Sequence, residues 1–320
     1  MIWQIFSKYL PSKHSNSDTF LLDGSVAGSM VDGDSLPVGF HDTVVSSRTV
    51  TAGGHRLRYL TAGSGQSLVL LHGGIIDAAG ISWGDLIEPL AEDASVYALD
   101  LLGYGESDLP PGPLSMARHV DTVAAVIDEL GLDDPVVAGL SMGGGVAVGL
   151  GLSAPERVGA LVPIDAFALG SDLSSGLLTW VLAKIQVTNH ISVALTARSR
   201  RFAEASLASL AFDADSIADV TVDRLMEEAQ RPNAGKAFRK FRASEVTRDG
   251  YRTNYADDVA TLDVPTHFVH GADDDLLPPA WSRRAAERTP GAELSILDDC
   301  GHLATLERPE SVRAIIRELL

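Results

Sequence analysis

The sequence predicts an α/β fold with a mainly parallel central sheet flanked by helices and with an inserted helical cap. Short apolar runs alternate with longer segments of helical apolar spacing, and this alternation is typical of parallel sheets. The alternation stops after Asp165 and resumes at Thr261. The 320 residues, 45% of them apolar, are enough for one large core and one inserted subdomain.

The chain divides into three parts on this pattern. Residues 1–40 are expected to be a flexible leader, because residues 15–37 are rich in Ser, Gly and Asp and show no periodicity. Residues 41–165 and 260–320 should form the α/β core, and residues 166–259 the helical cap. Apolar residues recur at helical spacing early in the expected cap, at Leu177, Leu178, Val181, Leu182 and Ile185.

The core elements follow in order along the chain. Short apolar or β-branched runs next to turn residues predict strands at residues 44–50, 55–59, 67–71, 95–99, 136–140, 160–164, 266–270 and 294–297. The first two strands flank Gly53 and Gly54 and should form a hairpin. Helices are predicted between later strands and at the end, at residues 83–90, 117–130, 143–152 and 311–320.

The strongest chemical signal is the pentapeptide Gly-Leu-Ser-Met-Gly at residues 139–143, between a predicted strand and a predicted helix. Its glycines permit a turn too sharp for larger side chains, and such a turn would lift the Ser141 hydroxyl above the sheet. The helix that follows would aim the backbone N–H of Met142 at a negative charge developing beside the serine. The sequence therefore predicts a nucleophilic serine.

A serine hydroxyl near neutral pH needs a histidine base and a carboxylate that orients the histidine. Two predicted strands downstream end in candidates for these roles. One is followed by Gly271 and three successive carboxylates at residues 273–275, and the other by Cys300-Gly301-His302. These candidates lie after the serine in the order acid, then histidine.

With these residues the chain resembles the α/β-hydrolase fold superfamily over residues 44–165 and 261–320. Four motifs in family order support the resemblance: the serine pentapeptide, Leu71-His72-Gly73-Gly74, the Asp-x-x-Gly-x-Gly-x-Ser turn at residues 100–107, and Gly301-His302 followed by Glu307-Arg308-Pro309-Glu310. The resemblance implies that His302 is the general base and that Gly74 and Met142 donate backbone N–H groups to an oxyanion. It also implies that the turn at residues 100–107 is structural.

The acid has more than one candidate. The family pattern places it three residues after the glycine that closes the strand, which selects Asp274. Asp273 and Asp275 are the neighbouring alternatives. Asp165 is a more distant rival, because it follows the strand at residues 160–164 and some relatives carry the acid there.

Other conspicuous residues are interpreted as structural. His72 is expected to be a hydrogen-bonding group within the oxyanion loop, and His267 and His270 to be core or loop residues without a metal, since no Cys or His cluster surrounds them. Cys300 is the only cysteine, so no intrachain disulfide forms, and we expect Cys300 to be a small buried residue and not a nucleophile. No cofactor is expected, because the glycine run at residues 143–145 lacks the lysine of a phosphate loop.

The charge balance restricts the partners. Asp and Glu number 43 against 25 Lys and Arg, and the formal net charge of −18 would repel nucleic acid and anionic membranes. We expect a small-molecule substrate, no integral membrane segment and a cytoplasmic location; the oligomeric state stays open. An acidic surface also resembles that of proteins from high-salt cytoplasms. A melting temperature that is low in dilute buffer and rises in molar salt would support this hypothesis, and indifference to salt would contradict it.

The expected activity is hydrolysis of a carboxylic ester through an acyl-enzyme, with specificity set by the cap. A serine in the pentapeptide argues against those relatives of the superfamily that use aspartate, the dehalogenases and epoxide hydrolases. Three alternatives stay open: a carbon-carbon bond hydrolase of ring-cleavage products, a cofactor-free perhydrolase, and a ligand-binding receptor with little turnover.

Overall fold

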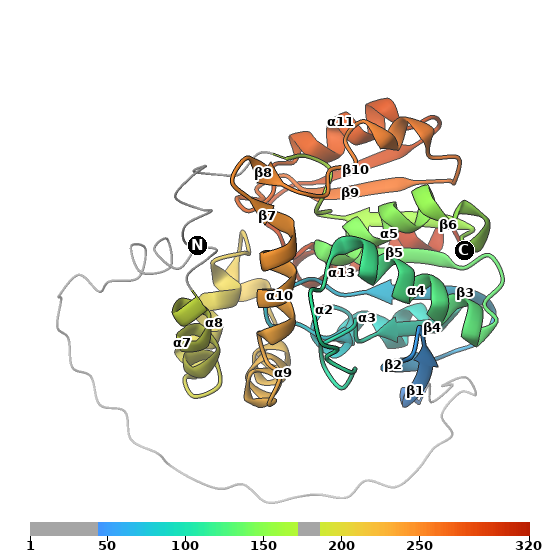
Figure 1. Ribbon diagram of the computed structural model, residues 1–320. Helices are drawn as coiled ribbons and strands as arrows, with labels where there is room; N and C mark the ends of the chain where they lie inside the picture. Colours follow the sequence, from blue (N-terminus) through green and yellow to red (C-terminus); the bar gives the residue numbers. More distant parts are fainter. Residues whose placement is uncertain (1–43, 172–185) are drawn as a thin grey trace, which may run out of the picture. The chain divides into compact units, whose positions relative to one another are not determined.

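Eight strands form one sheet in the order β1-β2-β4-β3-β5-β6-β9-β10 (Figure 1). The computed structural model describes residues 44–171 and 186–320. Two pairs, β1 with β2 and β2 with β4, are antiparallel, and the other neighbours are parallel. This confirms the mainly parallel α/β fold. The strands are β1 Ser46–Ala52, β2 His55–Ala62, β3 Gln66–Leu71, β4 Ala94–Leu99, β5 Val136–Leu140, β6 Ala160–Ile164, β9 His267–Gly271 and β10 Glu293–Leu297.

Helices cover both faces of this sheet and bury one apolar cluster on each. Within β3, Leu68 and Leu70 belong to one cluster and Val69 and Leu71 to the other, as the alternation of side chains along a strand requires. A strand that is covered on both faces has a nearly continuous run of apolar residues in its sequence. The flanking helices are α2 Ala79–Ser82, α3 Gly84–Leu90, α4 Met116–Leu130, α5 Met142–Ser153, α11 Ala280–Arg288, α12 Ala304–Glu307 and α13 Pro309–Arg317.

The register of the parallel strands aligns their carboxyl ends. Leu71 at the end of β3 pairs with Leu99 at the end of β4 and with Gly139 near the end of β5. On the other side, β5 pairs with β6 from Val136 to Leu140, and β6 contacts β9 at Ile164 and Val269. The loops that follow these strands therefore meet at one edge of the sheet.

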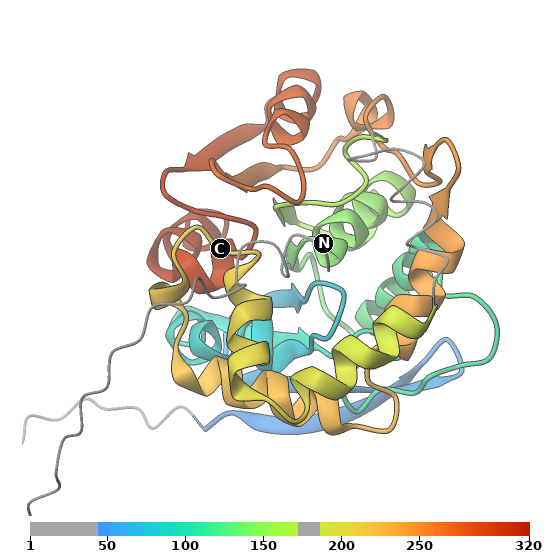
Figure 2. The ribbon, with the colours of Figure 1, turned by 90° about the vertical axis from the view of Figure 1, so that its left-hand side faces the viewer.

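A group of helices separates β6 from β9 in sequence; we call its described residues, 186–251, the helical insertion. Figures 1 and 2 show its yellow and orange helices beyond one end of the sheet. It contains α7 Gln186–Thr196, α8 Arg200–Ala208, α9 Asp219–Gln230, α10 Lys236–Glu245 and the strand pair β7 Val246–Thr247 and β8 Gly250–Tyr251. Short 3-10 helices lie at η1 Pro155–Arg157, η2 Ala214–Ser216 and η3 Asp258–Thr261. The predicted leader and the apolar spacing between Leu177 and Ile185 lie outside the described residues.

Some predicted boundaries are wrong by a few residues. The helix predicted from residue 83 begins at Gly84, because Trp83 joins it to the separate short helix α2. The last helix begins at Pro309, whose fixed φ suits a first helical turn, and ends at Arg317 rather than at residue 320. Two early strands also differ from their predicted bounds: β1 lies two residues later in the chain than predicted, and β2 continues to Ala62 instead of ending at Tyr59.

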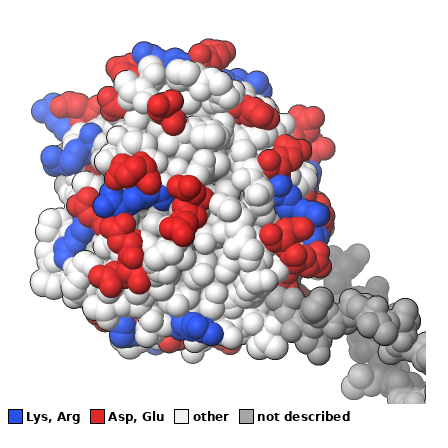
Figure 3. All heavy atoms as spheres, turned by 90° about the vertical axis from the view of Figure 1, so that its right-hand side faces the viewer, with Lys and Arg blue, Asp and Glu red and all other residues white. Residues whose placement is uncertain are grey.

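Acidic and basic side chains lie close together on the surface. Figure 3 shows one face on which Asp and Glu are next to Lys and Arg. Examples of such contacts are the ion pairs of Arg317 with Asp93 and of Arg224 with Asp85, at 2.8 Å each. Exposed pairs of this kind contribute little to stability. Within the described residues, no helix combines the length and the apolar character needed to cross a membrane.

Candidate active site

Ser141 lies in a strained turn between β5 and α5. Its φ of 54° and ψ of −111° are unusual for a residue with a side chain, and its N–H donates to the carbonyl oxygen of Ile164 at 2.8 Å. A Cβ at Gly139 would collide with the backbone of Gly143, and one at Gly143 would collide with the carbonyl oxygens of Leu71 and His72. The two glycines therefore permit the close backbone approach that holds Ser141 in this turn.

His302 connects Ser141 to a carboxylate. Its Nε2 lies 2.9 Å from Ser141 Oγ, and its Nδ1 lies 2.7 Å from Asp274 Oδ2. The three residues follow β5, β9 and β10, so the aligned strand ends bring together residues far apart in sequence. His302 and Asp274 are buried, whereas Ser141 is partly exposed. In this arrangement Nδ1–H donates to the carboxylate, and Nε2 is free to accept the serine proton.

The other three carboxylates that were candidates for the acid have different surroundings. Asp273 and Asp275 are exposed. Asp165 is buried, but its Oδ1 accepts a hydrogen bond from the Gly271 N–H at 2.8 Å and its Oδ2 accepts one from the Ala304 N–H at 3.3 Å. Among these carboxylates in the described part of the chain, Asp274 is the one hydrogen-bonded to His302.

The electrostatics of this pair stabilise a charged histidine. Burial opposes ionisation of Asp274, but the imidazoles of His302 and His270 hold the pKa of its carboxyl well below its usual range. Its Oδ1 also accepts hydrogen bonds from the N–H groups of Leu276 and Leu277. Burial would lower the pKa of His302, yet the charge and hydrogen bond of Asp274 raise it above the ordinary value. His302 is thus a stronger base than an isolated imidazole.

The two predicted oxyanion donors lie side by side. A Cβ built on Gly74 would be 3.9 Å from Met142 Cβ, and one on Gly73 would be 3.6 Å from Ser141 Cβ. Met142 is the first residue of α5, so its N–H has no acceptor within the helix. Within the described residues, neither the Gly74 N–H nor the Met142 N–H has a hydrogen-bond acceptor.

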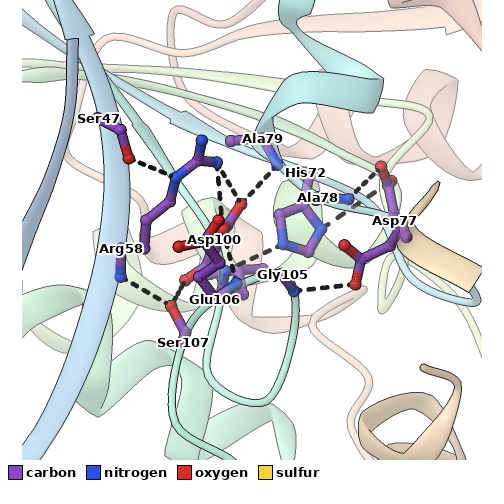
Figure 4. A network of polar contacts seen from close by, with 12 residues as sticks. Ser47, Arg58, His72, Asp77, Ala78, Ala79, Asp100, Gly105, Glu106 and Ser107 are labelled. Atoms are coloured by element: carbon purple, nitrogen blue, oxygen red, sulfur yellow. Dashed lines mark hydrogen bonds and ion pairs between the residues drawn. The ribbon is translucent and has the colours of Figure 1, made fainter. Parts of the chain in front are cut away.

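His72 fixes the geometry of the predicted oxyanion loop, and its ring lies beside Asp77 (Figure 4). Its Nε2 accepts the Leu101 N–H at 3.0 Å, so in the neutral ring the proton is on Nδ1, which donates to the Gly73 carbonyl oxygen at 2.8 Å. Asp77 Oδ2 accepts the Gly73 N–H at 2.8 Å. Because a peptide group is planar, fixing the Gly73 carbonyl also fixes the direction of the Gly74 N–H.

The turn at residues 100–107 supports the same loop (Figure 4). Asp100 Oδ1 accepts the N–H of Ala79, and its Oδ2 accepts the N–H of Glu106, at 3.0 Å each. Arg58 lies 3.3 Å from the Asp100 carboxylate, and Ser107 Oγ donates to the Asp100 carbonyl oxygen at 2.6 Å. These contacts join β2, the turn and the start of α2, and they agree with a structural role for this motif.

The helical insertion contacts the loop that carries His302. The Leu210 carbonyl oxygen accepts the His302 N–H at 2.7 Å. Glu307, which is buried, accepts the Phe212 N–H at 2.7 Å through Oε2 and the Gly301 N–H at 3.0 Å through Oε1. One carboxylate thus ties the insertion and the histidine loop together.

His270 is the residue near the site that sequence reasoning missed. It was expected to be a core or loop residue, and it is buried, but its Nε2 lies 3.2 Å from Asp274 Oδ2. Asp165, His270 and Asp274 are close enough to share a metal ion. Their donor atoms already have hydrogen-bond partners in Gly271, Ala304, Ser282 and His302, so we describe a hydrogen-bonded cluster. The position of His270, directly before the glycine that closes β9, was the available signal.

The fold and this site define an α/β hydrolase with a serine at the strand-to-helix turn. Residues 68–315 match the model of the Alpha/beta hydrolase family, and the chain belongs to this family. It is therefore an enzyme of the hydrolase class.

The individual relatives compared below share less than 30% sequence identity with this chain. A 2-hydroxymuconate semialdehyde hydrolase of Pseudomonas putida is 28% identical over 280 residues, which are 85% of this chain and 93% of that protein. The structure of a meta-cleavage product hydrolase of Pseudomonas fluorescens IP01 superposes with a TM-score of 0.72 at 24% identity, over 85% of this chain and 96% of that one. A carboxylesterase of Bacillus subtilis gives a TM-score of 0.70 at 22% identity, over 87% and 92%. These two structures show likeness of fold.

Proposed function

We propose that the protein is a serine hydrolase that cleaves a carboxylic ester of a small molecule through an acyl-enzyme intermediate. The observation that carries the proposal is the continuous hydrogen-bonded path from Ser141 Oγ through His302 to Asp274, with distances of 2.9 and 2.7 Å. The low pKa of the Asp274 carboxyl and the raised pKa of His302 suit a general base oriented by an ionised acid.

In the acylation half, Ser141 Oγ forms a bond to the carbonyl carbon of the ester while His302 Nε2 takes the hydroxyl proton. The negative charge on the carbonyl oxygen is stabilised by the N–H groups of Gly74 and Met142. When the intermediate collapses, the bond to the leaving oxygen breaks, and that oxygen takes the proton from His302. The products of this half are an alcohol and acylated Ser141.

The deacylation half repeats the same proton path with water. His302 Nε2 takes a proton from the water as its oxygen bonds to the acyl carbon. The bond to Ser141 Oγ then breaks, and the serine regains its proton from His302. Asp274 stays ionised throughout and stabilises the imidazolium in both halves.

We also infer that the helical insertion acts as the cap that selects the substrate. Phe238 of α10 packs on the oxyanion loop, with ring atoms 3.0 and 3.1 Å from a Cβ built on Gly74. The hydrogen bond from His302 N–H to Leu210 adds a second contact with the site. A substrate carbonyl at Ser141 would therefore lie next to insertion side chains.

Hydrolysis of a carbon-carbon bond in a ring-cleavage product is the second candidate. What favours it is the relative that is 28% identical and named a 2-hydroxymuconate semialdehyde hydrolase. The same Ser141, His302 and Asp274 set serves this reaction class, so the two candidates differ in substrate and not in the position of the proton relay.

Turnover of p-nitrophenyl esters across acyl lengths, beside cleavage of 2-hydroxymuconate semialdehyde, tests the two candidates. We expect ester turnover with an optimum acyl length that reflects the space left by the insertion. Cleavage of the semialdehyde without ester turnover would replace the first candidate by the second. Absence of both activities, together with tight binding of either compound, would contradict both and favour a receptor.

A further inference from the structure

A second imidazole contacts the same carboxylate oxygen as His302. His270 is fully buried at the end of β9, and its Nε2 lies 3.2 Å from Asp274 Oδ2. That oxygen also lies 2.7 Å from His302 Nδ1. With Oδ1 held by the N–H groups of Leu276 and Leu277, the Asp274 carboxylate has two polar neighbours on each oxygen.

The surroundings of His270 determine where its ring proton lies. Nε2 faces three acceptors: the Leu277 carbonyl oxygen at 3.1 Å, Asp274 Oδ2 at 3.2 Å and Asp165 Oδ1 at 3.9 Å. Nδ1 lies 2.7 Å from Ser282 Oγ, a hydroxyl that both donates and accepts. Nε2 must therefore carry a proton whether the ring is neutral or charged. The Ser282 hydroxyl donates to Nδ1 when the ring is neutral and accepts a hydrogen bond from Nδ1–H when the ring is charged.

We propose that His270 is a positioning residue that donates a hydrogen bond from Nε2 to Asp274 Oδ2 and thereby limits the basicity of His302. The inference rests on the proposed function, since it concerns the same proton relay. In this arrangement the imidazoles of His270 and His302 share the Asp274 carboxylate, and His302 also contacts the nucleophile Ser141.

Two carboxylates lie close to His270: Asp165 follows β6, and Asp274 follows β9. The loop after β10 carries His302 and Cys300, which interact with both carboxylates, and α12 carries Glu307, which interacts with His302 and Cys300. Burial raises the pKa of Asp165 to about 6, although His270 and His302 oppose the rise. Burial would lower the pKa of His270, but the hydrogen bond with Asp274 and the charge of Asp165 raise it above the ordinary value. Burial raises the pKa of the Cys300 thiol, which stays neutral.

Removal of the His270 donor has a predictable sign. A hydrogen bond to Asp274 Oδ2 disperses part of the negative charge that His302 experiences. Without it, Asp274 stabilises the imidazolium form of His302 more strongly, so the pKa of His302 rises. Only neutral His302 accepts the Ser141 proton, so activity is lost as pH falls through that pKa. The acid limb of the pH profile must therefore move to higher pH.

The test compares His270→Met with His270→Gln, two side chains of similar shape of which only glutamine keeps an N–H donor. In His270→Met we expect the acid limb of kcat/KM to move up by on the order of 0.5 to 1 pH unit. We also expect kcat at the pH optimum to fall about 10- to 100-fold with little change in KM. His270→Gln should restore most of both. His267→Gln, in the same strand and hydrogen-bonded to Ser295, is the control.

The same pH series with a fluorophosphonate removes the dependence on a chosen substrate. Ser141 Oγ would bond to phosphorus as the phosphorus-fluorine bond breaks, with the serine proton passing to His302 and fluoride leaving. Absence of labelling in the parent would overturn the proposed function and the inference with it. Labelling with the same acid limb in His270→Met as in the parent would overturn the inference alone. Should His270→Met fail to fold, His270→Asn is expected to show the same shift, because the shorter asparagine amide should lie where Nδ1 faces Ser282 and not where Nε2 faces Asp274.

Discussion

Replacing Ser141 by alanine is expected to lower kcat for ester hydrolysis by at least about 10⁴-fold, because Ser141 is the residue that forms the acyl-enzyme in the proposed mechanism. Binding should persist, since alanine removes one oxygen and leaves the oxyanion loop and the insertion in place. The free energy of unfolding should change by less than about 1 kcal/mol, because the substitution is small and the residue is partly exposed. Single-turnover kinetics and a denaturant titration measure these two quantities.

The matched control for this variant is Ser153→Ala. Ser153 ends α5, the helix that Ser141 precedes, and it is exposed with its hydroxyl donating to the Gly149 carbonyl oxygen at 2.8 Å. It should keep the parent's turnover. Parent-like turnover in Ser141→Ala would contradict the nucleophile assignment and would require a different attacking group.

Replacing Asp274 by asparagine is expected to lower kcat by about 10⁴-fold with a small change in KM. The amide keeps the shape of the carboxyl group but cannot stabilise the imidazolium form of His302. It also favours the ring tautomer in which Nε2 carries the proton and cannot accept the one on Ser141. Steady-state kinetics over a pH series separates this loss from a change in binding.

The neighbours of Asp274 are the controls, because they were the alternatives at the level of sequence. Asp273→Asn and Asp275→Asn alter exposed carboxylates and should leave kcat within about twofold of the parent. Asp165→Asn alters a buried carboxylate bonded to two backbone N–H groups, so its main effect should be on stability. A loss in Asp165→Asn as large as that in Asp274→Asn, with the protein still folded, would contradict this choice of acid.

The fold was largely accessible from the sequence because its strands are short, apolar and buried on both faces. Val136–Leu140 and Ala160–Ile164 were placed at their observed bounds. Ends that depend on a few atoms could not be predicted: the helix predicted from Trp83 begins at Gly84, and β2 extends to Ala62 through its pairing with β4. The short helix α2, which precedes Trp83, was not predicted. Local composition does not encode such pairing.

The residues of the candidate site could be predicted from the sequence where a motif contains them. The structure brings Ser141, Asp274 and His302 within hydrogen-bond distance, and their catalytic roles stay predictions. His270 could not be placed, because its contact with Asp274 depends on how β9 and the loop after it curve around the ring. The contact between Leu210 and His302 joins residues 92 positions apart, and no spacing rule predicts it.

The hydrogen bonds that Glu307 and Leu210 accept set a limit on chimeric enzymes. A designer who grafts a foreign helical segment onto this core, to change what it accepts, would cut between the core and the segment at β6 and β9. The stretch at residues 210–213 lies on the segment side of that cut, yet it supplies the carbonyl oxygen on the His302 N–H and two of the N–H groups that Glu307 accepts. A graft that omits this stretch would deprive the histidine loop of its support. In any such exchange, residues 210–213 therefore belong with the core.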